Sequence, residues 1–134
     1  MSRELDIAWL AGILEGEGYF SIERDTTGYH DVTVIRIVLT MTDYDIVERS
    51  ARIMGAPRVI HVKRPASYKE TCKPQYRAKI SGDRAIGVLR EILPYMGQRR
   101  SARIKDQIAA HESRSTWSMG AKRRVARQKE KAAA

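Results

Sequence analysis

The chain of 134 residues suits one domain with a hydrophobic core, and its formal net charge of +9 favours a polyanionic partner, although basic ribosomal-type proteins share that balance. One cysteine excludes an intrachain disulfide framework, the three histidines lack zinc-ligand spacing, and no apolar run approaches the ~20 residues of a membrane span. We therefore expect a soluble intracellular protein of the cytoplasm or nucleoid, or of an organelle that encodes it, with no membrane partner.

Hydrophobic periodicity and turn residues predict an α+β domain with the element order αββαββαα. Its sheet is four-stranded and mostly antiparallel, with helices over one face. Helices are predicted for residues 5–16, 43–54, 83–92 and 97–112, and strands for residues 18–25, 31–41, 58–64 and 75–81. Thr42 or Asp43 caps the second helix and Gly55 ends it, while Asp83 caps the third, which Pro94 terminates.

The first predicted helix has one face of small residues. Ala8, Gly12 and Gly16 lie four positions apart, so another helix backbone can approach closely along them. Each glycine costs roughly 1 kcal/mol relative to Ala in a helix interior, and a helix–helix interface would compensate. Glu17 stands at the negative end of the helix dipole, where a divalent cation would relieve repulsion. Alternatively, Gly16 and Gly18 only stop the helix and Glu17 is solvated.

Alternation along the strands predicts one face for the core and one polar face outward. The expected core set is Phe20, Ile22, Ile35, Ile37, Leu39, Ile60, Val62, Tyr76, Ala78 and Ile80. The expected outward set is Ser21, Glu23, Asp25, Val34, Arg36, Val38, Thr40, His61, Lys63, Gln75, Arg77 and Lys79. Such a mixture can hydrogen-bond base edges, and a twisted ribbon of strands fits a major groove. An ordinary solvated face has a similar composition.

The C-terminal segment differs from the rest of the chain. We expect the domain to occupy residues 1–113 and a basic tail to occupy residues 114–134. Within that tail, Lys122 to Lys131 contribute six basic residues and one acid, about +5 of the total +9. The tail either binds nucleic-acid phosphates non-specifically or is a disordered segment that keeps the protein soluble.

The segment Leu10-Ala-Gly-Ile-Leu-Glu-Gly-Glu-Gly18 resembles the LAGLIDADG motif of homing endonucleases over nine consecutive positions. Residues 32–48 resemble the family's second strand and the start of its second helix, and residues 95–104 resemble the basic start of its last long helix. The resemblance covers roughly residues 5 to 112. With one motif per chain, it implies a homodimer whose Ala8–Gly12–Gly16 stripes pack at a two-fold axis.

The resemblance also implies an activity and assigns roles. It implies metal-dependent hydrolysis of both strands of a long, pseudo-palindromic DNA duplex. The implied cofactor is Mg²⁺, with two or more ions per dimer, and Mn²⁺ or Ca²⁺ would suit the same site. No organic cofactor is implied. Glu17 matches the metal-binding acid, with the Gly16 carbonyl as a further ligand, and Glu15 matches a more structural acid. Gln98 stands where the family often has a catalytic Lys, so Arg99 or Arg100 is the substitute. Asp43 stands where a polar residue organises water.

Two other interpretations stay open at this point. One is a non-cleaving nucleic-acid-binding relative, such as an intron-splicing maturase. The other is an unrelated basic nucleic-acid-binding protein in which Gly12 and Gly16 serve packing alone; this second possibility predicts a stable monomer.

Overall fold

The computed structural model describes residues 2–25, 32–63 and 72–113. The elements in chain order are α1 (Arg3–Glu17), β1 (Gly18–Asp25), β2 (Val32–Met41), α2 (Tyr44–Met54), β3 (Ile60–Val62), β4 (Gln75–Ser81), α3 (Gly82–Ile92) and the short 3-10 helix η1 (Leu93–Tyr95). A further helix, called the last helix below, covers the described residues 98–113. The predicted α+β class and element order are confirmed. The predicted tail, residues 114–134, lies outside the described part.

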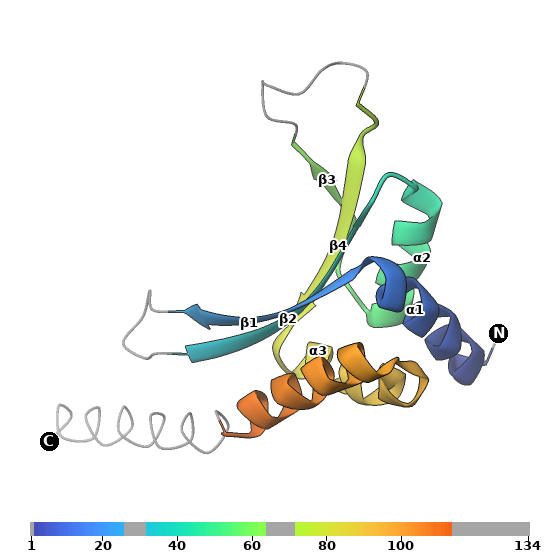
Figure 1. Cartoon of the computed structure of the whole chain (residues 1–134). Coiled ribbons are helices and arrows are strands. Elements are labelled where there is room, and N and C mark those ends of the chain that lie inside the picture. The colour runs from blue at the N-terminus through green and yellow to red at the C-terminus, as the bar shows by residue number, and fades with distance from the viewer. Residues whose placement is uncertain (1, 26–31, 64–71, 114–134) are drawn as a thin grey trace, which may run out of the picture.

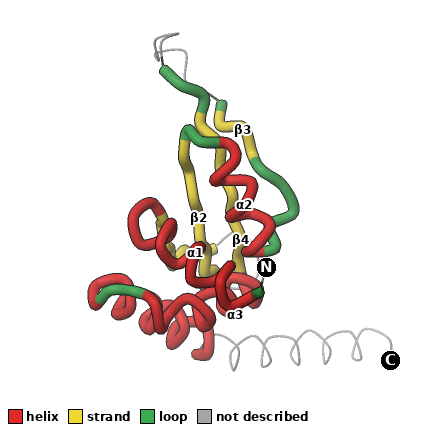
Figure 2. Tube along the Cα trace, turned by 90° about the vertical axis from the view of Figure 1, so that its right-hand side faces the viewer, coloured by secondary structure: helices red, strands yellow, loops and turns green. Residues whose placement is uncertain are grey.

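The four strands form one antiparallel sheet in the order β1-β2-β4-β3. Figure 1 shows that this sheet is curved, with the helices on its convex side. Figure 2, turned by 90°, shows α2 in front of β2 and β4. The opposite, concave face of the sheet is therefore free of helices in the described part of the chain, as the alternating pattern predicts.

The core lies between the sheet and these helices. Each β2 residue of the predicted core set, Ile35, Ile37 and Leu39, is fully buried, and so are Leu10 and Leu14 of α1. The last helix adds Ile104, and α3 adds Leu89 and Ile92, all without exposed surface. Burial of side chains of this size contributes about 1.5–3 kcal/mol each. This core fixes α1 and the last helix against the convex face of the sheet.

Helix and strand ends differ from the prediction at three places. The first helix begins at Arg3, because the Ser2 hydroxyl accepts a hydrogen bond from the Leu5 amide at 3.3 Å. The third helix begins at Gly82, whose φ of +66° suits glycine, so Asp83 lies inside the first turn and is not the cap. The strand predicted for residues 58–64 is only three residues long, because pairing with β4 is limited to residues 60–62.

Candidate metal and nucleic-acid site

The junction between α1 and β1 is built around Gly18. The Gly18 amide closes the last turn of α1 by donating to the Leu14 carbonyl. A Cβ at Gly18 would lie 2.6 Å from that same carbonyl oxygen, closer than a side chain tolerates. The chain therefore passes directly from helix to strand, and this sharp transition places Glu17 at the helix end with its side chain exposed.

The last helix begins beside this junction. The Gly97 amide donates to Glu15 Oε2 at 3.2 Å, and Arg100 Nη1 donates to the Gly18 carbonyl at 2.7 Å. Gln98 and Arg99 lie between those two anchors in sequence, and both are exposed. The structure thus brings two of the predicted catalytic residues to the end of α1 that carries Glu17.

Asp43 stands apart from these contacts. It occupies the N-cap position of α2, yet its side chain makes no capping hydrogen bond and is exposed. No hydrogen bond or ion pair between described residues joins Asp43 to α1 or to the last helix. Its predicted catalytic role stays a prediction.

The donors at the end of α1 suit a hard divalent cation. Glu17 offers carboxylate oxygens, and the Gly16 carbonyl lacks an i+4 amide partner because the helix stops at Glu17. Oxygen donors of both kinds are those that Mg²⁺ and Ca²⁺ prefer. Within the described ranges no three His, Cys, Asp or Glu side chains gather into a metal-binding group.

The small-residue stripe of α1 faces outward. No atom of the described residues, apart from the helix's own backbone, lies within 4 Å of the position that a Cβ would take at Gly12 or Gly16. Ala8 is half-buried, and Leu5, one turn earlier, keeps 62% of its surface exposed. The stripe is therefore open to a partner rather than packed inside this chain.

Sheet register confirms most of the predicted outward face. Residues paired across strands share a face, and the pairing joins Ser21 to Arg36, Glu23 to Val34, Val38 to Lys79, and Thr40 to Arg77. Ser21 lies on this face but keeps only 3% of its surface exposed, so its predicted direct contact with DNA is not supported. Asp25 pairs with Val32 at the end of β1 and so continues the same set along the backbone. Gln75 belongs to this face as well, two residues before Arg77.

The face predicted for β3 is wrong. Ile60 pairs with Arg77 and Val62 pairs with Gln75, so both apolar residues lie on the outward face. His61 pairs with Tyr76 and stacks on its ring at 5.4 Å between centroids, on the face of the helices. By the same alternation Lys63, just beyond β3, falls on the face of His61, so its predicted outward position is not supported either. The side chain of His61 is nevertheless exposed, because β3 is short and lies at the sheet edge.

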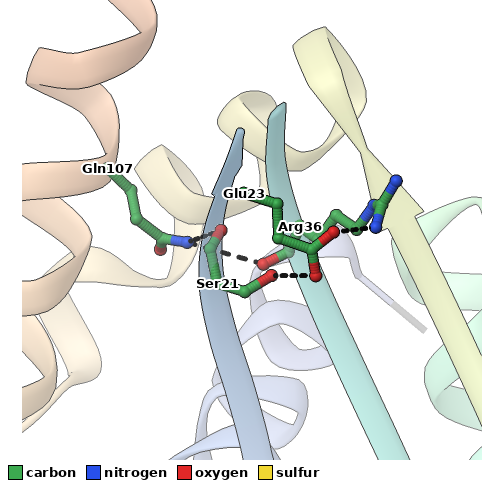
Figure 3. A network of polar contacts seen from close by, with 4 residues as sticks. All are labelled: Ser21, Glu23, Arg36 and Gln107. Atoms are coloured by element: carbon green, nitrogen blue, oxygen red, sulfur yellow. Dashed lines mark hydrogen bonds and ion pairs between the residues drawn. The ribbon is translucent and has the colours of Figure 1, made fainter. Parts of the chain in front are cut away.

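Four residues form a polar network across β1 and β2 (Figure 3). Ser21 Oγ donates to Glu23 Oε1 at 3.4 Å, and the other oxygen of Glu23 forms an ion pair with Arg36. From the last helix, the fully buried Gln107 donates to the Ser21 carbonyl at 2.9 Å and to the Arg36 carbonyl at 3.5 Å. The network fixes the strand pair that carries Arg36 while leaving its guanidinium partly exposed.

Solved structures share the fold of this chain. The homing endonuclease I-CvuI, in complex with its target in the presence of Ca, matches with a TM-score of 0.68 and 17% identity, covering 87% of this chain and 71% of that chain. The archaeal intron-encoded homing endonuclease I-Vdi141I, complexed with DNA, matches with a TM-score of 0.58 and 15% identity, covering 89% and 72%. The LAGLIDADG meganuclease I-CpaMI, bound to uncleaved DNA, matches with a TM-score of 0.53 and 14% identity, covering 72% and 32%.

The chain has the LAGLIDADG homing endonuclease fold. No protein-family model and no curated protein matches the sequence. In this LAGLIDADG fold, α1 is the helix formed by the motif-like segment, and β1 to β4 form the sheet. I-CvuI has also been crystallised with uncleaved DNA in the presence of Mg. No helix in the described part of the chain combines the length and apolar character needed to cross a membrane.

The LAGLIDADG fold also reveals residues that sequence reasoning missed. Tyr19 pairs with Val38 on the outward face and is 63% exposed, which counting by twos from Ser21 would have found. Gln107 reaches β1 from 86 residues away along the chain. Arg100, which the sequence suggests only as an alternative catalytic cation, reaches it from 82 residues away, and no local pattern signals either contact.

Proposed function

We propose that this chain is a site-specific DNA endonuclease that binds a long pseudo-palindromic duplex as a homodimer and hydrolyses both strands with a divalent metal. One observation carries the proposal. The segment that resembles the LAGLIDADG motif folds as a helix against the convex face of a homing-endonuclease sheet, and it leaves Gly12, Gly16 and Glu17 exposed together. A purely structural helix would gain nothing from that combination.

The homodimer is supported by the open stripe. Two glycines in an isolated helix cost about 1 kcal/mol each, and nothing within the described chain packs against them to compensate. A second α1 packed along the stripe would bring its backbone close and cover Leu5. The same packing sets the two Glu17 carboxylates near the symmetry axis, where a cation offsets their repulsion.

The chemistry assigned to the chain's own residues follows from their positions. Glu17 and the Gly16 carbonyl of each subunit hold the ion, for which Mg²⁺ is the expected species and Mn²⁺ and Ca²⁺ have the same oxygen preference. When bound there, Mg²⁺ would polarise a phosphoryl oxygen and would lower the pKa of an attacking water. Arg99, exposed beside this turn, stabilises negative charge that develops on the phosphate. Gln98 and Asp43 orient water by hydrogen bonding.

The outward face of the sheet supplies the duplex-binding surface. It carries the cations Arg36, Arg77 and Lys79 among small polar and apolar residues, on a curved sheet without helices over it. Arg77 is already oriented by a hydrogen bond from its Nε to Thr40 Oγ1 at 3.1 Å. Arginine side chains held in this way suit the major-groove edge of guanine.

The test is cleavage by Glu17→Gln on a duplex recovered by selection. The variant keeps the side-chain length but loses the carboxylate, so we expect nicking to fall below detection while duplex affinity stays within about threefold, less than the tenfold that 1.4 kcal/mol represents. Glu48→Gln, at an exposed position of α2 and not on the small-residue stripe of α1, is the matched control and should cleave normally. Wild-type cleavage by Glu17→Gln would remove this residue from the catalytic role.

A second candidate function is duplex or RNA binding without cleavage, as in a maturase. The observation that favours it is the neutral Gln98 at an exposed position where the family often has a lysine. Specific binding by the wild-type chain, with no cleavage in either Mg²⁺ or Mn²⁺, would select this candidate over the endonuclease.

A further inference from the structure

Two contacts tie the end of α1 to the start of the last helix, one on each side of Glu17. On one side, Glu15 Oε2 accepts a hydrogen bond from the Gly97 amide at 3.2 Å, and a Cβ at Gly97 would lie 3.0 Å from Glu15 Oε1. On the other side, Arg100 Nη1 donates to the Gly18 carbonyl at 2.7 Å. The pair brackets the turn Gly16–Glu17–Gly18, and we refer to these two contacts as the turn clamp.

Arg100 is committed to this contact. Its guanidinium carbon lies 5.2 Å from the centre of the Phe20 ring, and its Nε has almost no exposed surface. That Nε has no hydrogen-bond partner within the described ranges. By contrast, its neighbours Gln98 and Arg99 are exposed. The guanidinium of Arg100 is therefore partly buried against β1, whereas Arg99 is exposed to solvent, so the two arginines have different structural roles.

The end of α1 needs such a residue. Three features make it negative: the helix dipole, Glu15 and Glu17. The last turn of α1 contains no basic side chain of its own. Arg100 brings a positive charge to this end from the last helix. The Glu15 carboxylate in turn meets the positive N-terminal end of the last helix, which a carboxylate stabilises.

Glycines on both sides of Glu17 also make the turn intrinsically loose. Gly16 and Gly18 have more conformational freedom than any other residue, so the backbone between them is held by its contacts rather than by its sequence. A site for Mg²⁺ demands nearly ideal octahedral geometry, so its ligands must be oriented before the ion binds.

We propose that Arg100, assisted by Glu15, is a positioning residue of the metal-binding turn. The clamp holds the Gly16 carbonyl and the Glu17 carboxylate in the orientation that accepts one divalent ion, and Arg100 itself touches neither ion nor phosphate. The inference rests on the proposed function, since it assumes that Glu17 and Gly16 are metal ligands.

The experiment compares Arg100→Met with Arg103→Met in the full-length protein. Arg103 is the matched control, because it lies on the same helix and its Nε donates to the Phe20 carbonyl at 3.3 Å, two residues beyond the turn. Both variants remove a guanidinium and keep an apolar stem. Ca²⁺ is titrated calorimetrically into each protein bound to the duplex that wild type selects, and circular dichroism follows thermal unfolding.

We expect Arg100→Met to weaken Ca²⁺ affinity about tenfold, at the lower end of the effect of residues that orient metal ligands. The Mg²⁺ concentration for half-maximal cleavage should rise by a similar factor, with duplex affinity unchanged. Arg103→Met should leave both metal readouts within about twofold of wild type, a fraction of that orienting effect. If Arg100→Met does not fold, Glu15→Ala carries the test, since it breaks the other half of the clamp and should shift Ca²⁺ affinity in the same direction.

Equal Ca²⁺ affinity in wild type, Arg100→Met and Glu15→Ala would overturn the inference, and so would equal losses in Arg100→Met and Arg103→Met. Those outcomes leave the proposed function intact. Failure of wild type itself to bind Ca²⁺ on its duplex would contradict the proposed metal site, so the two failures are distinguishable.

Discussion

Gly12→Ala should have opposite effects on the single chain and on the dimer. In the single chain, Gly12 is exposed, and no atom of the described residues beyond its own helix backbone lies within 4 Å of a Cβ there. Alanine is favoured over glycine in a helix interior by about 1 kcal/mol. Because nothing opposes the added methyl group, the monomer should gain about that amount of stability.

In the dimer, the same methyl group stands where we propose that a second α1 packs. Even a gap of 0.5–1 Å between packed surfaces forfeits roughly a quarter to a half of their van der Waals attraction. We therefore expect the dimer dissociation constant to rise at least tenfold, about 1.4 kcal/mol. The net result is a more stable chain that dimerises less.

The matched control for this prediction is Gly87→Ala. Gly87 is an exposed glycine inside α3 with equally open surroundings, away from the proposed interface. Urea unfolding at protein concentrations below the dissociation constant measures chain stability, and sedimentation equilibrium measures dimerisation. Both variants should unfold at higher urea, and only Gly12→Ala should dissociate. An unchanged dissociation constant in Gly12→Ala, or an equal change in both variants, would refute the proposed dimer interface along the small-residue stripe.

Three further substitutions test other parts of the structure. Gly18→Ala places a Cβ 2.6 Å from the Leu14 carbonyl oxygen, so urea unfolding should show a loss of about 1–3 kcal/mol, and an unchanged midpoint would contradict this close approach. Gln107→Leu leaves two strand carbonyls without their buried donor, and the same assay should show a loss of about 1–3 kcal/mol. A stabilised protein would show that this donor is dispensable. Lys79→Gln removes one proposed phosphate contact per subunit, so the slope of log affinity against log salt should become shallower by about 1.8 for the proposed dimer, whereas the same change at Lys105, exposed on the last helix, should leave the slope unchanged.

Features set by local chemistry were predictable from the sequence. Gly55 ends α2 in the left-handed conformation, with φ of 75°, as a glycine directly after an amphipathic helix indicates. The outward faces of β1, β2 and β4 followed from alternation, because these strands are long enough for the pattern to be unambiguous. The position of Glu17 at a helix end was also predictable, because the flanking Gly16 and Gly18 are local helix-stop signals.

Features set by distant contacts were not predictable. The face of β3 depends on how Ile60 and Val62 register against β4, and a three-residue strand with apolar residues on its outward face misleads any alternation rule. A glutamine in a helix is usually exposed to solvent. Gln107 is nevertheless fully buried, because the carbonyls of Ser21 and Arg36 in the sheet accept hydrogen bonds from its side chain. The turn clamp joins residues 15 and 18 to residues 97 and 100, which only the fold brings together.

Selection of cleaved sites from a randomised duplex library, with Mg²⁺ present, tests the central claim most directly. The proposed endonuclease should enrich one long site with pseudo-two-fold symmetry, cut on both strands, and the Glu17→Gln protein should enrich none. Recovery of no cleaved site by the wild-type protein, or of the same sites by Glu17→Gln, would contradict the account.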